Sequence, residues 1–345
     1  MQKFILFLVA SLFCYRLSAQ QNPQYSQYMM NTYLINPAVV GIEDYTDIKV
    51  GYRNQWTNFE GAPTTYYLTA HFALDKPDRT STGPTPYISK TIRRPITPSR
   101  QYSGKPRVPG HQGVGISLIS DNMGPSSQIS LLGSYAYHIP VTGHSKLAIG
   151  ASGGVTQYTL DFSNLQVKVN PDPAIMGGGK ITAIQPTINV GAWYYSMNYY
   201  IGVSANQLLF ENYNLKPTGD NSSTYSWVGS VYPHYFLSAG YRFDATDYWT
   251  VMPSVLVKKV NLAPVTYDVN LKAMYDNRFW IGASYRNKDA FVGLVGFNIN
   301  SLLNIGYSYD FTLSDINQRS RGSHEVVIGV MLNNRHKILC PQNSW

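Results

Sequence analysis

The stretch that decides the fold of this chain is Val265-Thr266-Tyr267-Asp268-Val269-Asn270-Leu271-Lys272-Ala273-Met274-Tyr275. Its odd-numbered positions are apolar or aromatic, and its even-numbered positions are polar with the single exception of Met274. Because successive side chains of a β-strand point to opposite faces, this period of two predicts a strand with one apolar and one polar face. The same alternation recurs in the segments 235–243, 279–285 and 303–311.

The polar face of these segments consists mainly of Gly, Ser, Asn and Thr, with few charges. The 345-residue chain is 44% hydrophobic and 13% charged, against roughly 25% charged residues in ordinary soluble domains. This composition, with 28 Tyr and 28 Gly, argues against a cytosolic enzyme, a coiled coil or a disordered chain. Small polar residues inside and apolar residues outside are typical of an outer-membrane barrel. We therefore predict an all-β fold, a transmembrane antiparallel β-barrel in contact with the lipid of a bacterial outer membrane.

The alternating segments number about fourteen, an even number that returns both chain ends to the same side of the membrane. Short joints fall on one side and long joints on the other, as expected of short periplasmic turns and longer outer loops. The barrel is predicted over residues 46–332. Its expected strands are 46–56, 64–75, 112–120, 127–139, 145–155, 187–196, 199–208, 233–243, 248–258, 265–275, 278–287, 290–298, 302–311 and 324–332.

The first nineteen residues have the pattern of a secretory signal peptide. Lys3 precedes an apolar run, and Leu17-Ser18-Ala19 offers a small-residue cleavage site, so residues 1–19 are expected to be removed. Cleavage would leave Cys340 as the one cysteine of the mature chain, without a partner for an intramolecular disulfide. The longest uncharged stretch, 181–210, is interrupted by polar residues, which excludes a membrane-spanning helix.

The joint 76–110 departs from the pattern because it is long and lies on the side of the short turns. It carries eight basic residues, many Pro and one acid, Asp78, for a net charge of +7. Removing this charge and the two of the signal peptide from the total of +8 leaves −1 for the rest. This basic Pro-rich insertion is either a solvated tether or an electrostatic contact to anionic proteins, lipid or cell-wall polymer. Its candidate contact residues are Arg93, Arg94, Arg100, Lys105 and Arg107.

Chemical motifs in the chain are weak. Gly150-Ala151-Ser152-Gly153-Gly154 matches a nucleophile elbow formally, but it lies within a predicted strand. The seven His residues are dispersed and show no metal-ligand spacing. We therefore expect no catalytic residue, no metal, no cofactor and no nucleic-acid partner. A barrel hydrolase that pairs a lumen serine such as Ser152 with His71 or His138 is the enzymatic alternative.

The mature N-terminus carries a resemblance to a known family. The segment from Gln24-Tyr25-Ser26-Gln27-Tyr28 to Asn36-Pro37-Ala38-Val39-Val40-Gly41 resembles the opening of the PorP/SprF family of Bacteroidetes outer-membrane proteins. The likeness continues through Arg53-Asn54-Gln55-Trp56, Gly306-Tyr307-Ser308-Tyr309-Asp310-Phe311, Gly322-Ser323-His324-Glu325 and Cys340-Pro341. It covers nearly the whole mature chain in the same order, and the long insertion at 76–110 is its main departure.

The resemblance implies a barrel of the type IX secretion system, which exports adhesins, gliding-motility proteins and enzymes. Its implied role is to support the export or surface attachment of a secreted protein through the C-terminal domain of that protein. Periplasmic components of the secretion system or peptidoglycan-associated proteins are the further implied partners. The alternative function is a passive diffusion porin, which would need an open lumen.

The segment 20–45 precedes the first strand and allows two interpretations. It could tuck into the barrel as a plug, or it could form a simple periplasmic turn that leads into the first strand. Asn36-Pro37 should form a turn in either case. The candidate plug or partner-binding residues are Asn36, Pro37, Gly41, Arg53, Gln55 and Trp56.

Among the residues that fall on the polar register of the strands are Arg53, Gln55, Arg242, Arg278 and Arg286. In a narrow lumen the arginines could pair with Asp268 or Asp310, or with carbonyls of the plug, because an unpaired charge away from water is costly. The alternative interpretation is that these side chains simply fill the lumen. Residues 333–345 are expected to form a C-terminal tail beyond the barrel.

Overall fold

The computed structural model describes residues 23–74, 110–142, 145–162, 180–209, 212–217, 227–261, 263–314, 316 and 320–334, with the backbone alone for 212–217 and 227–230. The predicted signal peptide and the five candidate residues of the basic insertion lie outside these ranges. So does all of the predicted tail beyond residue 334.

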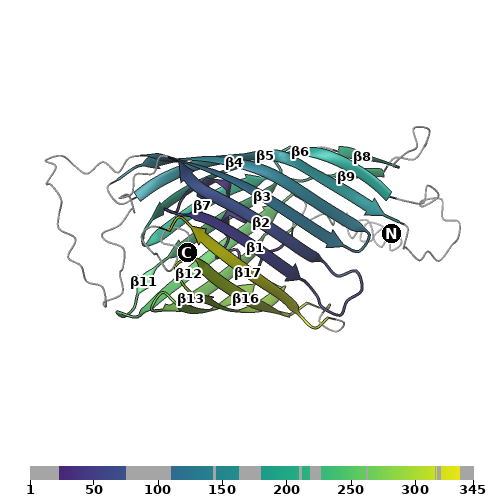
Figure 1. Ribbon diagram of the computed structural model, residues 1–345. Coiled ribbons are helices and arrows are strands. Elements are labelled where there is room, and N and C mark those ends of the chain that lie inside the picture. Colours follow the sequence, from purple (N-terminus) through teal and green to yellow (C-terminus); the bar gives the residue numbers. More distant parts are fainter. Residues whose placement is uncertain are drawn as a thin grey trace, which may run out of the picture.

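The fold is a closed antiparallel β-barrel with fourteen strands in its wall, as the alternation predicted. Neighbours in the wall follow the chain order, and β1 closes the ring by pairing with both β2 and β17 (Figure 1). The wall strands are β1 (Thr46–Asn54), β2 (Thr64–Leu74), β3 (His111–Met123), β4 (Ser126–Pro140), β5 (Ser145–Asp161), β6 (Lys180–Ser196), β7 (Tyr199–Asn206), β10 (His234–Tyr241), β12 (Trp249–Val260), β13 (Thr266–Tyr275), β14 (Phe279–Arg286), β15 (Ala290–Asn298), β16 (Leu303–Thr312) and β17 (Ser323–Leu332).

Three short strands lie outside this ring of fourteen. The hairpin of β8 (Asn212–Pro217) and β9 (Trp227–Ser230) attaches to the wall through two residue pairs between β8 and β6. β11 (Phe243–Asp244) continues the line of β10 along β12. The hairpin falls in the expected long loop 209–232, where its two strands are too short for the period of two to identify them.

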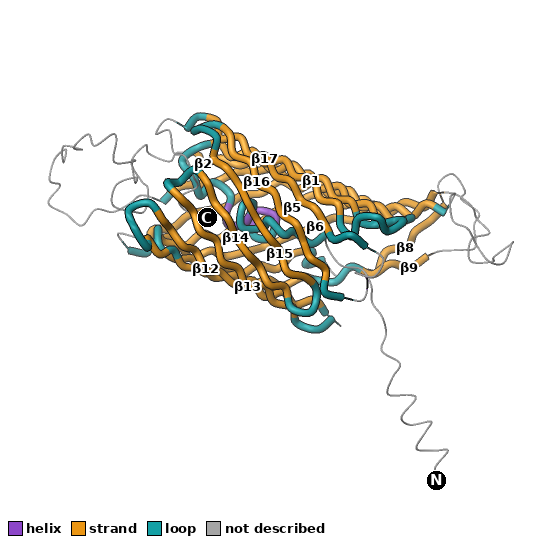
Figure 2. Tube along the Cα trace, turned by 90° about the horizontal axis from the view of Figure 1, so that it is seen from below, coloured by secondary structure: helices purple, strands orange, loops and turns teal. Residues whose placement is uncertain are grey.

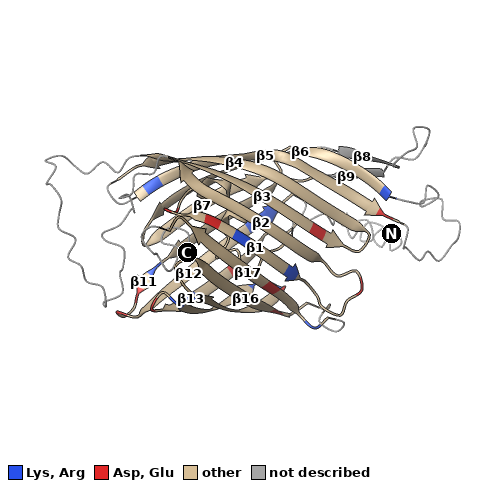
Figure 3. Cartoon of the chain, in the orientation of Figure 1, with Lys and Arg blue, Asp and Glu red and all other residues tan. Residues whose placement is uncertain are grey.

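The two faces of the wall are sorted as the alternation predicted. On β13, Leu271 is 52% exposed, whereas Asn270 and Lys272, its neighbours in the chain, are 1% and 7% exposed. The exposed face carries the apolar and aromatic residues, so it is the surface that meets hydrocarbon. Figure 3 shows how few charged residues interrupt the strands.

The two ends of the barrel differ in their connections. At the terminal end, where β1 begins and β17 ends, β6–β7, β13–β14 and β15–β16 are joined by short turns. At the opposite end, which we call the loop end, the connections include 162–179 and 207–233. The connection 75–110 between β2 and β3 is the exception, because it is long and lies at the terminal end. Short turns on the periplasmic side and longer loops outside are the rule for such barrels, and the other connections therefore predict that the terminal end faces the periplasm.

The strands at the loop end are longer than predicted. β5 and β6 each have 17 residues, so the ranges 156–161 and 180–186 are strand and not loop as the sequence suggested. Ile181 and Ala183 are buried there against Tyr158, Leu160 and Phe162. This apolar cluster gives the extended hairpin its own packing beyond the length that is needed to cross the membrane.

The remaining described residues at the start of the chain lie inside the barrel. They form two turns of 3₁₀ helix, η1 (Thr32–Leu34) and η2 (Pro37–Val39), which Figure 2 shows in purple within the ring of strands. Residues 26–29 and 35–43 of this segment are buried. No helix among the described residues is long and apolar enough to cross a membrane.

Candidate functional site in the barrel lumen

The lumen holds residues 23–45, which we call the internal segment. Ser26 contacts Arg53, Asp310 and Glu325, which lie in the loop-end parts of their strands. Gly41 contacts His71 and His111, which lie near the terminal end. The segment therefore runs through the lumen from the loop end to the terminal end, where the chain turns back into β1.

The loop-end contact is an ion network centred on Arg53. Its guanidinium donates to Asp310 Oδ2 at 2.7 Å, to Glu325 Oε2 at 3.2 Å and to Ser26 Oγ at 2.8 Å. Ser26 in turn donates from Oγ to Asp310 and from its backbone N–H to Glu325, both at 2.7 Å. The start of the internal segment therefore adds hydrogen bonds to two buried carboxylates, Asp310 Oδ2 and Glu325 Oε2, which strengthens both the ion pairs and the attachment.

A second arginine extends the same network across the lumen. Arg286 donates from Nε to Asp268 at 3.2 Å and lies within 3.4 Å of both Asp289 and Asp310. Its second terminal nitrogen donates to Ser26 Oγ at 3.3 Å. The expected pairing of the lumen arginines with Asp268 and Asp310 is thus present for Arg53 and Arg286, and both converge on one serine of the internal segment.

The other two arginines pair with nearby aspartates and not with Asp268 or Asp310. Arg278 lies in the turn between β13 and β14, pairs with Asp276 and has a side chain that is 68% exposed. Arg242 lies at the end of β10 and pairs with Asp244. Arg278 continues the alternation numerically, but it lies in an exposed turn beyond the end of the strand. Arg242 keeps its inward register between the exposed Tyr241 and Phe243, with a side chain that is 11% exposed, and its partner is a nearby residue of β11 and not Asp268 or Asp310.

The middle of the internal segment is held by Asn31, Tyr33 and Asn36. Asn31 donates to Thr69 at 2.9 Å, and the Tyr33 hydroxyl donates to Ser134 at 2.7 Å. Asn36 is the N-cap of η2, and its side-chain oxygen accepts from the Ala38 N–H at 2.9 Å. Its amide nitrogen donates to two wall carbonyls, Ala192 and Val203, at 3.1 Å each.

Pro37 follows this cap at the first position of η2, where a fixed φ suits the turn and the missing N–H is not needed. The turn that the sequence predicted at Asn36-Pro37 is therefore present. The same asparagine also bridges two neighbouring strands of the wall, which the dipeptide alone could not indicate.

Gly41 marks the point where the segment meets the wall at the terminal end. Its φ is +77°, and a Cβ at this position would lie 2.4 Å from the Cα of Gly113 on β3. Only glycine permits this backbone conformation together with such a close approach. This is the physical reason for a glycine at the end of the segment that resembles the family's opening.

Three histidines surround the same point. Gly41 donates its N–H to His71 Nδ1 at 3.3 Å, and its carbonyl accepts from His111 Nε2 at 3.0 Å. The neighbouring Val40 carbonyl accepts from His138 Nε2 at 2.8 Å. The rings of His111 and His138 stack with their centroids 4.2 Å apart. These residues are dispersed in the sequence and were not expected to act together, because only strand pairing brings them to one place.

Gln55 and Trp56 do not reach the lumen. They lie in the loop-end turn after β1, where Gln55 N–H donates to the Pro63 carbonyl and Trp56 N–H donates to Ser323 Oγ. Both side chains are half-buried at the rim. The family-like stretch that starts at Arg53 is thus split, because the strand ends at Asn54.

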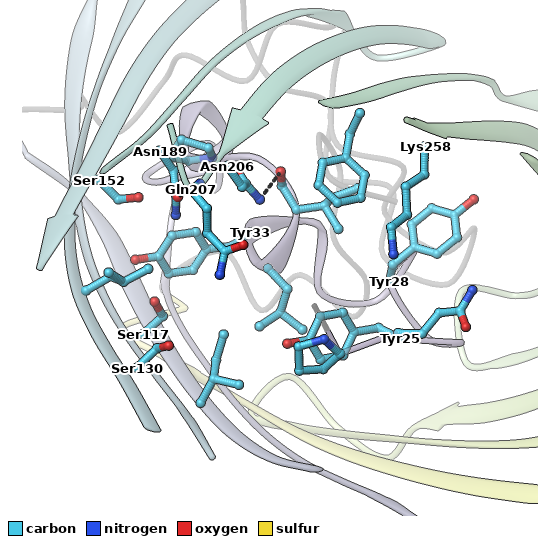
Figure 4. A pocket seen from close by; sticks show the side chains of 18 of the residues that line it. Tyr25, Tyr28, Tyr33, Ser117, Ser130, Ser152, Asn189, Asn206, Gln207 and Lys258 are labelled. Carbon is cyan, nitrogen blue, oxygen red and sulfur yellow. Dashed lines mark hydrogen bonds between the residues drawn. The ribbon is translucent and has the colours of Figure 1, made fainter. Parts of the chain in front are cut away.

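A cavity, which we call the vestibule, remains between the internal segment and the wall. Its empty volume is about 1020 Å³, including space open to solvent. Figure 4 shows Ser117, Ser130, Ser152, Asn189 and Asn206 on one side and Lys258 on the other. Tyr25, Tyr28 and Tyr33 of the internal segment also line it.

Several solved barrels resemble the chain at low sequence identity. They include the toluene transporter TbuX of Ralstonia pickettii, with 12% identity, 88% of this chain and 93% of that chain covered, and a TM-score of 0.45. The toluene transporter TodX of Pseudomonas putida has 10% identity, coverage of 91% and 94%, and a TM-score of 0.43. A FadL homologue of Pseudomonas aeruginosa has 10% identity, coverage of 91% and 95%, and a TM-score of 0.45. No curated protein matches the chain.

The closed wall, its apolar outer face and its polar lumen define a membrane-spanning β-barrel. The family model described as type IX secretion system membrane protein PorP/SprF matches residues 17–330, nearly the whole chain. The chain belongs to the PorP/SprF family, as the N-terminal and C-terminal motifs indicated. It is an outer-membrane barrel associated with type IX secretion.

Proposed function

We propose that this barrel is a non-catalytic component of type IX secretion whose lumen is plugged by the internal segment. In this role it supports the export or surface attachment of a secreted protein, of the adhesin or gliding-motility type, through the C-terminal domain of that protein. The observation that carries the proposal is the attachment of the internal segment at both ends of the lumen. Ser26 joins the ion network at one end, and Gly41 sits among three histidines at the other.

The same observation argues against the passive porin. A diffusion porin needs an open, water-filled lumen, whereas residues 26–29 and 35–43 are buried within this one. Arg53 and Arg286 are also engaged with carboxylates and with Ser26, so they do not line an open constriction. Ion conduction through the native barrel should therefore be small.

The loop end is the proposed surface for the secreted partner. The extended hairpin of β5 and β6 lies at this end and is stabilised by its own apolar cluster. The β8–β9 hairpin pairs with β6 beside it. Loops on a rigid scaffold commonly carry recognition, and this end faces away from the periplasm. The basic insertion follows β2 at the terminal end, which suits a role for it toward periplasmic secretion or peptidoglycan-associated components.

The absence of catalysis is part of the proposal. Ser152, the serine of the formal nucleophile motif, lies within the long strand β5 and not at a strand-to-helix elbow. Purified protein should therefore remain unlabelled by a fluorophosphonate probe, and labelling of Ser152 would favour a hydrolase instead.

Planar-bilayer recording tests the plug. The full mature barrel should conduct poorly, and a variant that lacks residues 23–43 should give large, stable currents. The variant Arg278→Met is the matched control, since its side chain lies outside the lumen and its current should equal that of the native barrel. Large, stable currents from the native barrel would favour the porin.

Secretion is tested in the native bacterium. Deleting the gene should remove at least one protein with a type IX C-terminal domain from the cell surface or the medium, as measured by mass spectrometry. The same protein should co-purify with the full chain from detergent-solubilised outer membrane. An unchanged set of surface and secreted proteins, with no exported protein co-purifying, would contradict the proposal.

A further inference from the structure

We propose that the vestibule binds an uncharged oligosaccharide unit. This proposal is independent of the secretion role. It rests on three properties of the cavity: a wall of hydroxyl and amide side chains, a lining with almost no charge, and apolar and aromatic groups on the side of the internal segment. Each property is set by described residues.

The wall of the vestibule is built from neutral polar side chains on five neighbouring strands. They are Ser117, Gln128, Ser130, Ser152, Thr156, Thr187, Asn189 and Asn206. Three of these hydroxyls form a continuous chain, with Ser130 Oγ 2.9 Å from Thr156 Oγ1 and Thr156 Oγ1 2.8 Å from Thr187 Oγ1. A hydroxyl has one donor and two acceptor sites, so the chain keeps capacity for a ligand.

One residue that lines the cavity has a side-chain atom without a hydrogen-bond partner in the described part of the chain. Asn206 is 7% exposed, and its amide nitrogen donates to the Ile35 carbonyl of the internal segment at 3.3 Å. Its side-chain oxygen is buried and has no hydrogen-bond partner among the described residues. A buried acceptor without a donor is costly, so a residue that lines the vestibule retains unused hydrogen-bonding capacity.

The charge of the lining selects against ionic ligands. Lys258 and Asp268 are the two charged residues among those that line the cavity, and they have opposite signs. Asp268 is also paired with Arg286 at 3.2 Å. A phosphate or carboxylate ligand would need a cluster of cations, which this lining lacks among the described residues. A neutral ligand meets no such requirement.

The internal segment supplies an apolar surface opposite the hydroxyls. Leu34 and Ile35 line the cavity together with the rings of Tyr28 and Tyr33, and Phe236 lies on the wall. Pockets that bury a small ligand commonly combine apolar area with a few polar groups that fix orientation. A sugar ring has both an apolar C–H face and a rim of hydroxyls, so it matches the two sides at once.

Two other neutral ligands fit less well. A hydrocarbon would leave the hydroxyl and amide groups of the wall unpaired when it displaced water, which costs free energy. An extended peptide gains affinity by pairing its backbone with a strand edge, and the closed wall offers none at the vestibule. The oligosaccharide is therefore the class that the lining favours.

The test is a printed array of neutral and charged glycans, probed with the fluorescently labelled full mature barrel in detergent. We expect binding to a subset of neutral glycans, confirmed by titration calorimetry with the strongest one. Binding to no glycan, or to anionic or cationic glycans alone, would overturn the proposal. Capture of peptides from a parallel peptide array without any glycan signal would also overturn it.

Variants locate the binding. The double variant Ser152→Ala/Thr187→Val should weaken the affinity about tenfold, and Asn206→Ala provides a second, separate measurement. The matched control is Ser145→Ala/Thr250→Val, which makes the same changes at buried terminal-end positions outside the vestibule. The heat-dependent gel mobility of each variant shows whether its barrel is folded. Glycan affinity that is unchanged in both folded vestibule variants would refute the assignment.

Discussion

The guanidinium of Arg53 on β1 lies 2.7 Å from the carboxylate of Asp310 on β16, although 257 residues separate them in the chain. Both groups are nearly inaccessible to solvent, and both contact Ser26. The closure of the barrel and the attachment of the internal segment thus depend on the same ion network.

Arg53→Met should destabilise the barrel by about 3–5 kcal/mol, because removing one partner leaves buried charges uncompensated. Urea titration of the barrel in lipid vesicles, followed by tryptophan fluorescence, measures the change. Arg278→Met should change the stability by less than about 0.5 kcal/mol, since Arg278 is an exposed turn residue. Equal effects of the two variants would show that the network contributes little. The double variant Arg53→Met/Asp310→Asn should recover part of the loss, because it removes charges of both signs.

Gly41→Ala should detach the terminal-end part of the internal segment. The new Cβ would lie 2.4 Å from the Cα of Gly113, and the φ of +77° disfavours alanine by itself. Limited proteolysis in detergent should cut the variant within residues 23–45, while the native segment resists cleavage. Gly153→Ala is the control, because a Cβ there meets nothing within 4 Å. Resistance of Gly41→Ala to cleavage would argue against the close contact.

Leu271→Arg should destabilise the folded barrel by about 2–4 kcal/mol if Leu271 meets the middle of the hydrocarbon layer. Leu271 is 52% exposed on the outer face of β13. Leu313→Arg makes the same change at a loop-end position that is 50% exposed. Its cost should be about 0–1 kcal/mol, as found near the membrane interfaces. The measurement is urea titration in vesicles, and similar costs at both sites would contradict the placement of the lipid band.

Pro23→Cys should react with a membrane-impermeant maleimide on intact cells. Pro23 lines the vestibule beside Gln128 and Lys258, in the loop-end part of the lumen, although β1 begins at the opposite end. The experiment uses a Cys340→Ser background, so that the maleimide labels only the introduced cysteine of the mature chain. Asp44→Cys at the terminal end should react only after the outer membrane is permeabilised. If Asp44→Cys reacted on intact cells and Pro23→Cys reacted only after permeabilisation, the internal segment would run in the opposite direction relative to the membrane.

Much of the wall could be predicted because its signal is local. The alternation in Val265 to Tyr275 depends on each residue and its immediate neighbours, and the observed exposures on β13 follow it position by position. The number of wall strands follows in the same way. The extensions of β5 and β6 could not be predicted, since they depend on the packing of Ile181 and Ala183 against residues of a neighbouring strand.

The candidate site was predicted less completely. Asn36, Pro37, Gly41 and Arg53 all lie at contacts between the internal segment and the wall. Gln55 and Trp56 lie at the rim of the barrel. They follow Arg53 closely in the family-like stretch, but the strand ends before them, so they do not enter the lumen with Arg53. The roles of His111 and His138 were missed, since their meeting requires the pairing of β3 with β4.

The amino-acid sequence by itself determined the strands, their two faces and the membership of the chain in the PorP/SprF family. These properties follow from short-range chemistry. The period of two assigns each side chain to one face of a strand, and a short family motif can be recognised from its own residues alone. The tertiary structure alone decided which charges pair, where the internal segment runs and which side chains line the vestibule. Those contacts join residues far apart in the chain, and the register of strand pairing that brings them together is settled only when the sheet closes.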